Sequence, residues 1–155
     1  MEERLDYAKA APGAYQAMLG IESYVRRCGL ERALLELVKA RVSQINGCAY
    51  CLDIQTKEAR AAHETEQRLY LLPAWKEVPF YTERERAALA WAEAVTQISA
   101  GGVSDDLYVE VRRHFDEKAL VDLTLAIVGI NGWNRLAVPF RSQAGSYQPE
   151  GAQEE

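Results

Sequence analysis

The sequence predicts an all-α protein, and three observations support this prediction. Ala, Leu, Glu, Arg and Lys dominate long stretches of the chain, and these residue types favour helices. No alternation of Val, Ile or Thr with polar residues continues for the length of a strand. Apolar residues instead recur three and four positions apart, as in Leu34, Leu35, Val38, Val42 and Ile45. That spacing gives a helix one apolar side that can face a core.

Start and stop signals divide the chain into about six to seven helices. Pro12 suits the opening turn of the first, and the pair Asn46-Gly47 readily adopts the positive φ that ends the second. Thr82 and Glu85 form a capping-box pattern at the start of another helix. The predicted helices cover 12–27, 30–45, 48–63, 67–72, 82–99, 104–114 and 117–138.

We expect one domain over residues 1–141 and a mobile tail over 142–155. A chain of 155 residues that is 48% hydrophobic has the length and the apolar content for one core. The segment after 141 is rich in Gly, Gln, Ser and Glu, which is typical of mobile termini. The helix over 117–138 is apolar on nearly all sides, so it is either the centre of the core or a subunit interface.

The charge and the N-terminus narrow the class of protein. A net charge of −5 argues against a general nucleic-acid binder, because no excess of Lys or Arg is available to neutralise phosphates. No apolar run of about 18 residues is present, which argues against a membrane span. The acidic start Met1-Glu2-Glu3 is unlike a secretory signal, so we expect a cytoplasmic protein. Three cysteines in that compartment are redox-active, metal-binding or simply buried.

The motif Cys48-Ala-Tyr-Cys51 carries the strongest chemical signal. Cys48 follows the predicted helix stop, so it lies at the start of the next helix, where unpaired N–H groups favour a thiolate. Cys51 follows one turn later on the same side, close enough for a reversible disulfide. The alternative is two small buried residues without chemistry. Zinc is disfavoured because Cys28, His63 and His114 form no second ligand pair, and we expect no metal and no cofactor.

Glu36 is the candidate acid–base residue. It lies among leucines and Val38, and a carboxyl at the edge of a buried surface has a raised pKa that suits a base. The alternative is an exposed residue that pairs with Lys39 or Arg32. Gln55 shares one side of the predicted third helix with the two cysteines.

The stretch from Glu36 to Arg60 resembles the signature of the carboxymuconolactone decarboxylase superfamily, and it is most similar to the alkylhydroperoxidase D-like (AhpD-like) branch. The segments 66–75 and 131–135 agree with that branch, so the resemblance covers nearly the whole chain. It implies an AhpD-like helical bundle that assembles as homotrimers or homohexamers. It also implies a dithiol that reduces hydroperoxides and is recycled by a dithiol protein or a small thiol. The decarboxylase activity is disfavoured, because that branch does not depend on a cysteine pair.

The resemblance also implies roles for individual residues. Cys51 would attack the peroxide as the peroxidatic thiol. Cys48 would be the resolving thiol, which attacks the oxidised Cys51 to form a disulfide, and Glu36 would act as the base in a proton relay. The helix-start argument instead favours Cys48 as the more acidic thiol. Gln55 stands where the family has the relay histidine, and an amide cannot take up and release a proton near neutral pH. Two hypotheses follow, a thiol-dependent peroxidase with an antioxidant role and a weakly active redox sensor or disulfide-exchange protein.

Four further residues in these segments have expected roles. Trp133, Asn134 and Arg135 are expected to be structural, and to fix helix packing or a subunit contact. Tyr50, between the cysteines, either lends its hydroxyl to the site or packs as an ordinary aromatic.

Overall fold

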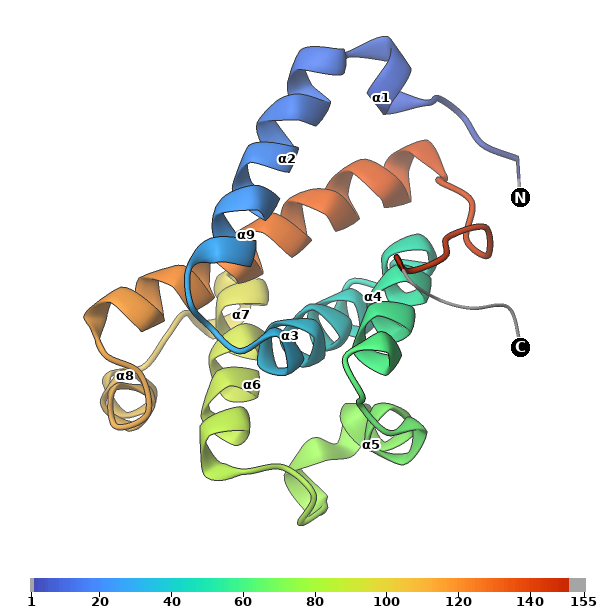
Figure 1. Ribbon diagram of the computed structural model, residues 1–155. Coiled ribbons are helices and arrows are strands. Elements are labelled where there is room, and N and C mark those ends of the chain that lie inside the picture. Colours follow the sequence, from blue (N-terminus) through green and yellow to red (C-terminus); the bar gives the residue numbers. More distant parts are fainter. Residues whose placement is uncertain (1, 151–155) are drawn as a thin grey trace.

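A computed structural model describes residues 2–150, and all regular secondary structure in this range is helical (Figure 1). The predicted all-α fold is therefore confirmed. The elements in chain order are α1 (Tyr7–Ala10), α2 (Pro12–Arg27), α3 (Arg32–Ile45), α4 (Ala49–Ala61), α5 (Glu66–Leu71), the 3₁₀ helix η1 (Leu72–Glu77), α6 (Glu83–Thr96), α7 (Ile98–Gly101), α8 (Asp105–Arg112) and α9 (Glu117–Phe140).

Several helices begin where predicted because a side chain caps their first turn. Thr82 and Glu85 form the predicted capping box: the hydroxyl of Thr82 accepts from the N–H of Glu85, and the carboxylate of Glu85 accepts from the N–H of Thr82 at 2.8 Å. Ser104 and Asp116 cap α8 and α9 through their side-chain oxygens. Each cap satisfies backbone donors that have no partner within the helix.

Two short helices add to the number predicted, and each has a local cause. α1 forms because the side chain of Asp6 accepts from the N–H of Lys9 at 3.1 Å. The predicted helix over 82–99 is divided at Gln97, whose φ of −99° and ψ of 35° leave the helical region, so α7 begins at Ile98. Residues 2–150 therefore contain nine α-helices rather than six to seven.

The centre of the domain is α3, which packs against α4, α6 and α9. Its residues Leu37, Val38, Ala40 and Val42 are each 0% exposed. Val38 and Val42 belong to the apolar side that the spacing predicts, whereas Leu37 and Ala40 lie outside it, because neighbouring helices cover α3 on more than one side. Full burial of each Leu or Val side chain contributes about 1.5–3 kcal/mol to folding. α3 therefore holds the two helices that build the site, α4 and α9, in fixed positions.

α9 crosses the domain as a core helix, with α2 against it (Figure 1). Leu123 and Ile127 of α9 are fully buried, whereas Val121 and Val128 are 67% and 49% exposed. Close packing of α2 depends on a glycine of α9: a Cβ at Gly129 would lie 3.1 Å from Cγ2 of Ile21. This chain thus covers α9 on most sides and leaves one apolar strip uncovered.

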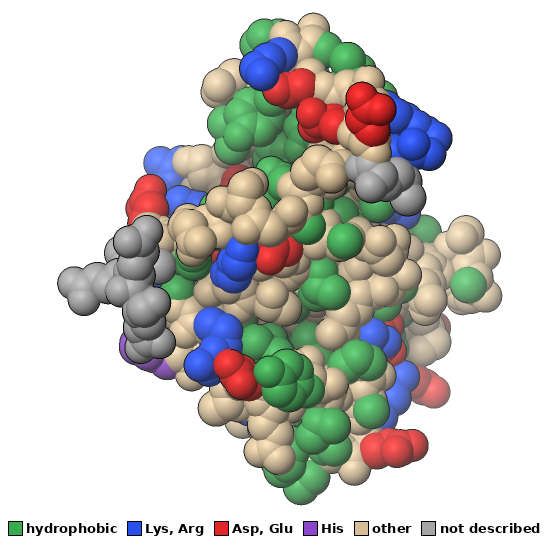
Figure 2. Space-filling model, turned by 90° about the vertical axis from the view of Figure 1, so that its right-hand side faces the viewer, with side chains coloured by type: hydrophobic (Ala, Val, Ile, Leu, Met, Phe, Trp, Pro, Cys, Tyr) green, Lys and Arg blue, Asp and Glu red, His purple; other side chains and the backbone are tan. Residues whose placement is uncertain are grey.

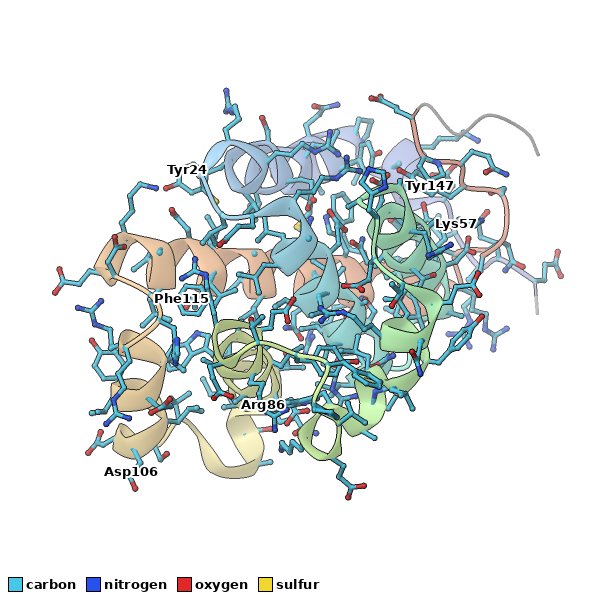
Figure 3. All side chains as sticks on the ribbon, turned by 60° about the horizontal axis from the view of Figure 1, so that its bottom comes forward. Tyr24, Lys57, Arg86, Asp106, Phe115 and Tyr147 are labelled. Atoms are coloured by element: carbon cyan, nitrogen blue, oxygen red, sulfur yellow. The ribbon has the colours of Figure 1, made fainter. Side chains whose placement is uncertain are left out.

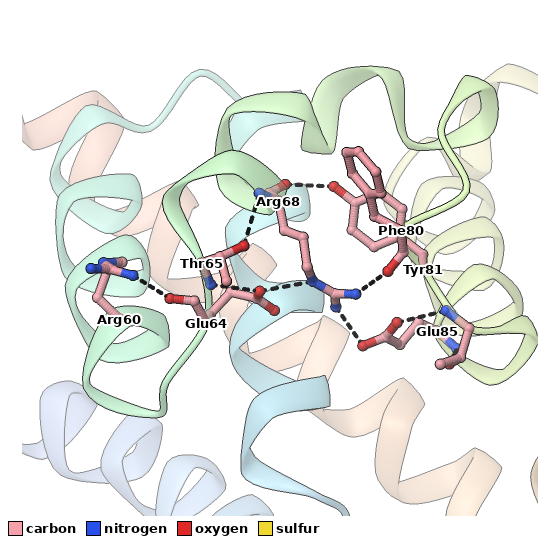
Figure 4. Close-up of polar contacts among 8 residues, drawn as sticks. Arg60, Glu64, Thr65, Arg68, Phe80, Tyr81 and Glu85 are labelled. Carbon is pink, nitrogen blue, oxygen red and sulfur yellow. Dashed lines mark hydrogen bonds and ion pairs between the residues drawn. The ribbon is translucent and has the colours of Figure 1, made fainter.

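Arg68 fixes the turn between α4 and α6 (Figure 4). Its guanidinium donates to Glu64 at 2.8 Å, to Glu85 at 2.6 Å and to the carbonyl of Phe80. The same group lies 4.8 Å from the ring centre of Tyr81. Because one planar group joins two carboxylates and a backbone carbonyl, α5 and the start of α6 move as a unit.

The C-terminal segment contacts α4 (Figure 3). The N–H of Gly145 donates to Asp53 at 2.9 Å, and Lys57 donates to the carbonyl of Tyr147 at 2.9 Å. The hydroxyl of Tyr147 donates to Glu58. Of the segment expected to be a mobile tail, residues 142–150 are described, and 151–155 lie outside the described residues. Its mobility stays a prediction.

The surface carries charges of both signs. Figure 2 shows Lys, Arg, Asp and Glu side chains interspersed with hydrophobic ones over one face of the molecule. In the part of the chain that the structure describes, no helix combines the length and the apolar character that crossing a bilayer requires.

Candidate dithiol site

The turn between α3 and α4 positions the first cysteine. Gly47 has a φ of 63°, a left-handed conformation that glycine adopts without strain. This turn lets the N–H of Cys48 donate to the carbonyl of Ser43 at 3.0 Å. Cys48 is the N-cap of α4, one residue before the first helical turn in which we expected it. The Asn-Gly stop predicted from the sequence therefore places Cys48 at the N-terminus of α4, where its side chain accepts from a backbone N–H of the first helical turn.

Both cysteines of the motif are free thiols inside the core. Cys48 is 1% exposed and Cys51 is 3% exposed. The Sγ atom of Cys48 accepts a hydrogen bond from the backbone N–H of Cys51 at 3.3 Å. Around them pack apolar side chains of α3 and α9, among them Val42 and Ile130. An external reagent therefore reaches the sulfurs only when this packing opens.

The two thiols differ in acidity. The neighbouring Cys51 thiol is the largest cause of a lowered pKa of Cys48, which is about 7. The backbone N–H groups of Cys51 and Tyr50 and the Asn134 side chain lower this pKa further, and burial opposes them. The hydrogen bond to Cys48 and burial raise the pKa of Cys51. The lower pKa falls on the cysteine that the helix-start argument favours, although its largest cause is the Cys51 thiol and not the helix-start N–H groups.

Glu36 is buried, which resolves the alternative left open by the sequence. The residue is only 8% exposed on α3, and burial raises the pKa of its carboxyl. The ammonium group of Lys39 lies 3.9 Å from its Oε1 atom and opposes that rise. Lys39 is itself held in an ion pair with Glu22 of α2. Oε2 of Glu36 has no hydrogen-bond donor in the described chain.

Gln55 lies on α4, the helix that packs against α3 and its Glu36. An ion pair of 2.5 Å between Arg32 and Glu58 joins the beginning of α3 to the end of α4. The Oε1 atom of Gln55 is buried and, like Oε2 of Glu36, has no donor among residues 2–150. Each of these buried acceptors can receive a hydrogen bond from a protonated carboxyl or from a hydroperoxide O–H group.

The remaining cysteine and histidines lie apart from the dithiol. Cys28 ends α2, and its carbonyl accepts from Lys118 near the start of α9. His63 is exposed in the turn after α4, and His114 lies 3.4 Å from Glu110 on α8. No group of three or more His, Cys, Asp or Glu side chains within residues 2–150 is arranged to hold a metal ion.

The sequence alone did not identify Asn134 as a site residue. We expected it to be structural, and its buried side chain accepts from Asn46 at 2.8 Å and donates to Ser43 at 3.2 Å, beside the turn that carries Cys48. Its amide also contributes to the lowered pKa of Cys48. The signal that could have indicated it is the asparagine-rich run Asn131-Gly132-Trp133-Asn134, because buried amides need partners. Tyr50 is half-buried, and burial is the largest cause of its raised pKa.

Fold and site define an all-helical protein with a buried dithiol at the start of a helix. The chain belongs to the carboxymuconolactone decarboxylase family, whose model matches residues 12–94. It is 44% identical over 146 residues to the uncharacterized protein YdfG of Bacillus subtilis (strain 168), which covers 94% of this chain and 99% of that protein.

Solved structures agree with this assignment. A crystal structure from Agrobacterium tumefaciens has a TM-score of 0.91 and 46% identity, covering 94% of this chain and 100% of that one. It is described as a protein of unknown function and a candidate antioxidant defence protein AhpD. The AhpD core of a peroxidase-related protein from Ralstonia eutropha JMP134 shares the fold, with a TM-score of 0.79, 18% identity, and 90% and 74% of the two chains covered. The predicted AhpD-like fold and branch are confirmed, and these relatives suggest an antioxidant role at the level of the family.

Proposed function

We propose that this protein is a thiol-dependent peroxidase that reduces hydroperoxides through a dithiol/disulfide cycle at Cys48 and Cys51. The support is the pair of buried free thiols at the start of α4, where Sγ of Cys48 accepts from the backbone N–H of Cys51 at 3.3 Å. Its donors lower the pKa of Cys48 to about 7, so a thiolate is available near neutral pH. The thiolate is the form of cysteine that attacks an electrophile such as a peroxide oxygen.

In the proposed cycle the two thiols together supply the two electrons and two protons that reduce one hydroperoxide. One sulfur attacks a peroxide oxygen, the O–O bond breaks, the leaving alkoxide takes a proton to become an alcohol, and the sulfur becomes a sulfenic acid. The second thiol attacks that sulfur, so that a disulfide forms and water leaves. A dithiol protein or a small thiol then returns two electrons and two protons by exchange through a mixed disulfide.

We assign the attack on peroxide to Cys51 and the resolving step to Cys48, as the family resemblance implies. Because the pKa of Cys51 is raised, its proton must leave before the attack. We propose that the neighbouring Cys48 thiolate takes this proton first, and that the buried carboxylate of Glu36 is the final acceptor. The lower pKa of Cys48 favours the opposite assignment, so the experiment must separate the two.

Single-cysteine variants test both the activity and the assignment. Wild type should consume an organic hydroperoxide in the presence of a dithiol reductant, and both Cys51→Ser and Cys48→Ser should lose turnover. If Cys51 attacks, Cys48→Ser still forms one sulfenic acid per chain, which a dimedone probe traps and mass spectrometry locates. The control Cys28→Ser should keep full activity, because this residue lies near the start of α9. Equal rates for wild type and Cys51→Ser would refute the peroxidase.

A second candidate function is a redox sensor or disulfide-exchange protein. Gln55 favours it, because its amide cannot shuttle a proton, and so does the burial of both sulfurs. This function requires a reversible disulfide between Cys48 and Cys51 without peroxide turnover. Mild oxidation followed by mass spectrometry measures the disulfide, and a pair that stays reduced would exclude the sensor.

We also propose that the chain assembles as a homotrimer or homohexamer. The support is the apolar strip of α9 that this chain leaves uncovered, with Val121 67% exposed and Val128 49% exposed. Such valines gain about 25 cal/mol per Å² when a neighbouring subunit covers them. Light scattering after size-exclusion chromatography measures the state, and a monomer at micromolar concentration would contradict the assembly.

A further inference from the structure

The first residues of the chain are tied to the end of α9. Residues 2–11, which include α1, are here called the N-terminal arm, and this arm lies beside the end of α9 (Figure 1). The backbone N–H of Arg4 donates to the carbonyl of Phe140 at 3.0 Å, and its guanidinium donates to the carbonyl of Pro139 at 3.1 Å. These hydrogen bonds place the arm next to the last turns of α9.

A row of aromatic rings leads from the arm to the core. The ring of Tyr7 in the arm lies 6.2 Å from the ring of Phe140 and 6.4 Å from the ring of Tyr15 on α2, measured between centres. Tyr15 in turn meets Trp133 of α9 edge to face, with 5.7 Å between the ring centres. Trp133 packs against the core cluster that contains both cysteines of the dithiol. The row therefore connects the arm to the cluster that encloses the sulfurs.

The arm also lies close to the first turn of α4. Tyr50, which stands between the two cysteines in the sequence, is half-buried and packs against the same core cluster. Burial is the main reason that the pKa of Tyr7 is raised to about 12, and the nearby Tyr50 and Cys51 raise it further. Glu3 of the arm acts in the same way on Tyr50, after the larger effect of burial. The arm is thus the outer layer over the start of α4.

Among the elements around the sulfurs, the arm is held most weakly. α3 and α9 bury many side chains in the core, whereas α1 has four residues and none of them is buried. The hydrogen bond from the N–H of Lys9 to Asp6 that caps α1 is exposed, and so is the bond from the Arg4 guanidinium to Pro139. Segments with few buried apolar contacts and exposed hydrogen bonds open at the lowest free energy. The arm can therefore open while the core helices stay packed.

We propose that the N-terminal arm is the gate of the dithiol, and that Tyr7 is the residue that closes this gate and so determines which reagents reach the sulfurs. With the arm in place, Cys48 and Cys51 are 1% and 3% exposed. Displacement of the arm takes Tyr7 away from the dithiol and leaves an approach bounded by the rings of Tyr15 and Trp133. Aromatic walls of this kind favour apolar reagents, and the width of the opening limits their size.

Alkylation of the thiols measures the opening of the gate without any peroxide. In a Cys28→Ser background only Cys48 and Cys51 remain as thiols, and mass spectrometry at pH 7 compares iodoacetamide with the larger N-phenylmaleimide. Tyr7→Ala removes two ring contacts that stabilise the closed arm. We expect N-phenylmaleimide to react about tenfold faster, which equals about 1.4 kcal/mol in the opening equilibrium. Iodoacetamide should gain less, because a small reagent also passes through narrower openings.

Two further variants separate access from acidity and from the loss of the hydroxyl. Tyr7→Phe keeps the ring and should react as wild type does. Arg4→Ala touches no ring and removes the guanidinium bond to Pro139, so it should speed alkylation in the same direction by a smaller factor. The pH midpoint of alkylation should stay at the wild-type value in Tyr7→Ala, because a phenol with a pKa of about 12 is uncharged near neutral pH. If Tyr7→Ala does not fold, Arg4→Ala decides, and wild-type rates in that variant would overturn the gate.

Tyr108→Ala is the matched control. Tyr108 is also a tyrosine whose ring lies against a tryptophan of the same core cluster, with 6.3 Å between its ring centre and that of Trp91. It belongs to α8, which packs against α6 and α9. Its replacement removes a comparable ring contact at another place on the core. Both alkylation rates should therefore stay at the wild-type values.

The results separate this inference from the proposed peroxidase, on which it rests only in that the dithiol is the reactive group. Faster alkylation of Tyr7→Ala without hydroperoxide turnover would retain the gate and reject the peroxidase. A folded Tyr7→Ala protein with wild-type alkylation rates would overturn the gate, whatever the turnover. Equal gains for the two reagents, or the same gain in Tyr108→Ala, would also overturn it, because the effect would then come from general loosening of the core.

Discussion

Lys39 and Glu36 lie one helical turn apart inside the domain, and the ammonium group of Lys39 is 3.9 Å from the nearer oxygen of Glu36. Lys39 is 5% exposed, and its stronger partner is Glu22 on α2. Two acids therefore share one buried cation, and Glu36 receives the weaker contact. This arrangement leaves Glu36 with a raised pKa although a lysine is nearby.

Glu36→Gln should change how stability depends on pH. Because burial raises the pKa of Glu36 in the folded protein, the stability that its neutral form contributes is fully present below the ordinary glutamate pKa. That contribution is lost as pH rises through the folded value. Glu36→Gln keeps a neutral side chain at every pH, so it should be about 1 kcal/mol more stable than wild type at pH 8, because it avoids the cost of an ionised carboxyl in a buried position.

Urea unfolding of wild type and Glu36→Gln between pH 4 and 8 measures this difference. The exposed residue Glu77 supplies the control, since Glu77→Gln should give a constant offset. A stability difference between wild type and Glu36→Gln that does not change with pH would show that Glu36 is as ionised in the folded protein as in the unfolded chain.

Cys51→Ala should make Cys48 less acidic. The thiol of Cys51 is the largest cause of the lowered pKa of Cys48, which is about 7. Alanine removes that donor and keeps the backbone N–H that reaches Cys48 at 3.3 Å. The pH midpoint for alkylation of Cys48 should rise by about one unit, which lowers the rate at pH 7 about fivefold because half of the thiol is already ionised there in wild type. Cys28→Ala, which leaves the site intact, should keep the wild-type midpoint.

Gln55→His should increase peroxide turnover if proton transfer limits the reaction. The imidazole would stand where Gln55 has a buried oxygen without a donor, and it can exchange a proton near neutral pH. Positioned acid–base groups contribute about 10²–10⁴-fold, so we expect a gain of at least tenfold. The exposed Gln67→His should have no effect. An unchanged rate in Gln55→His would mean that protons leave the dithiol by another route.

Tyr147→Phe should weaken the contact between the C-terminal segment and α4. Its hydroxyl donates to Glu58, and burial together with this hydrogen bond raises the pKa of Tyr147 to about 12. Hydrogen bonds to charged groups contribute about 1.5–3 kcal/mol, and we expect a loss near the lower value because the site is only partly buried.

Tyr70→Phe provides the comparison for that loss. Tyr70 also donates to a glutamate, Glu66, at 3.2 Å, but it is 73% exposed. Its removal should cost less than 0.5 kcal/mol, as expected of a surface contact. Equal losses in thermal unfolding for the two variants would indicate that the C-terminal segment is not held by Tyr147 in solution.

Local chemistry made most helix boundaries predictable. The capping box at Thr82 and the Asn-Gly stop before Cys48 depend on residues a few positions apart, and both form as expected. The break at Gln97 was missed because neither Gly nor Pro stands at that position. Its backbone leaves the helical region without a sequence signal.

The site was harder to predict, because burial depends on contacts between distant parts of the chain. The sequence is compatible with a buried or an exposed Glu36, and only the packing of α3 against α4 and α9 decides between them. The orientation of Asn134 depends on Asn46, which lies 88 positions earlier in the sequence. Hydrogen bonds between such distant residues carry no periodicity, so they cannot be read from spacing.

Cys48 and Cys51 belong to the same core cluster as Ile127 and Ile130. A molecule that meets either sulfur must therefore arrive during a transient loosening of the domain, and the sulfurs are shielded for the rest of the time. An oxidant that reacts with the pair should therefore reach a maximum rate at high concentration, set by how often the domain loosens, whichever oxidant is supplied. The hydrophobic core thus limits access to the two sulfurs. Substitutions that loosen the core should raise the maximum rate of reaction before they unfold the chain.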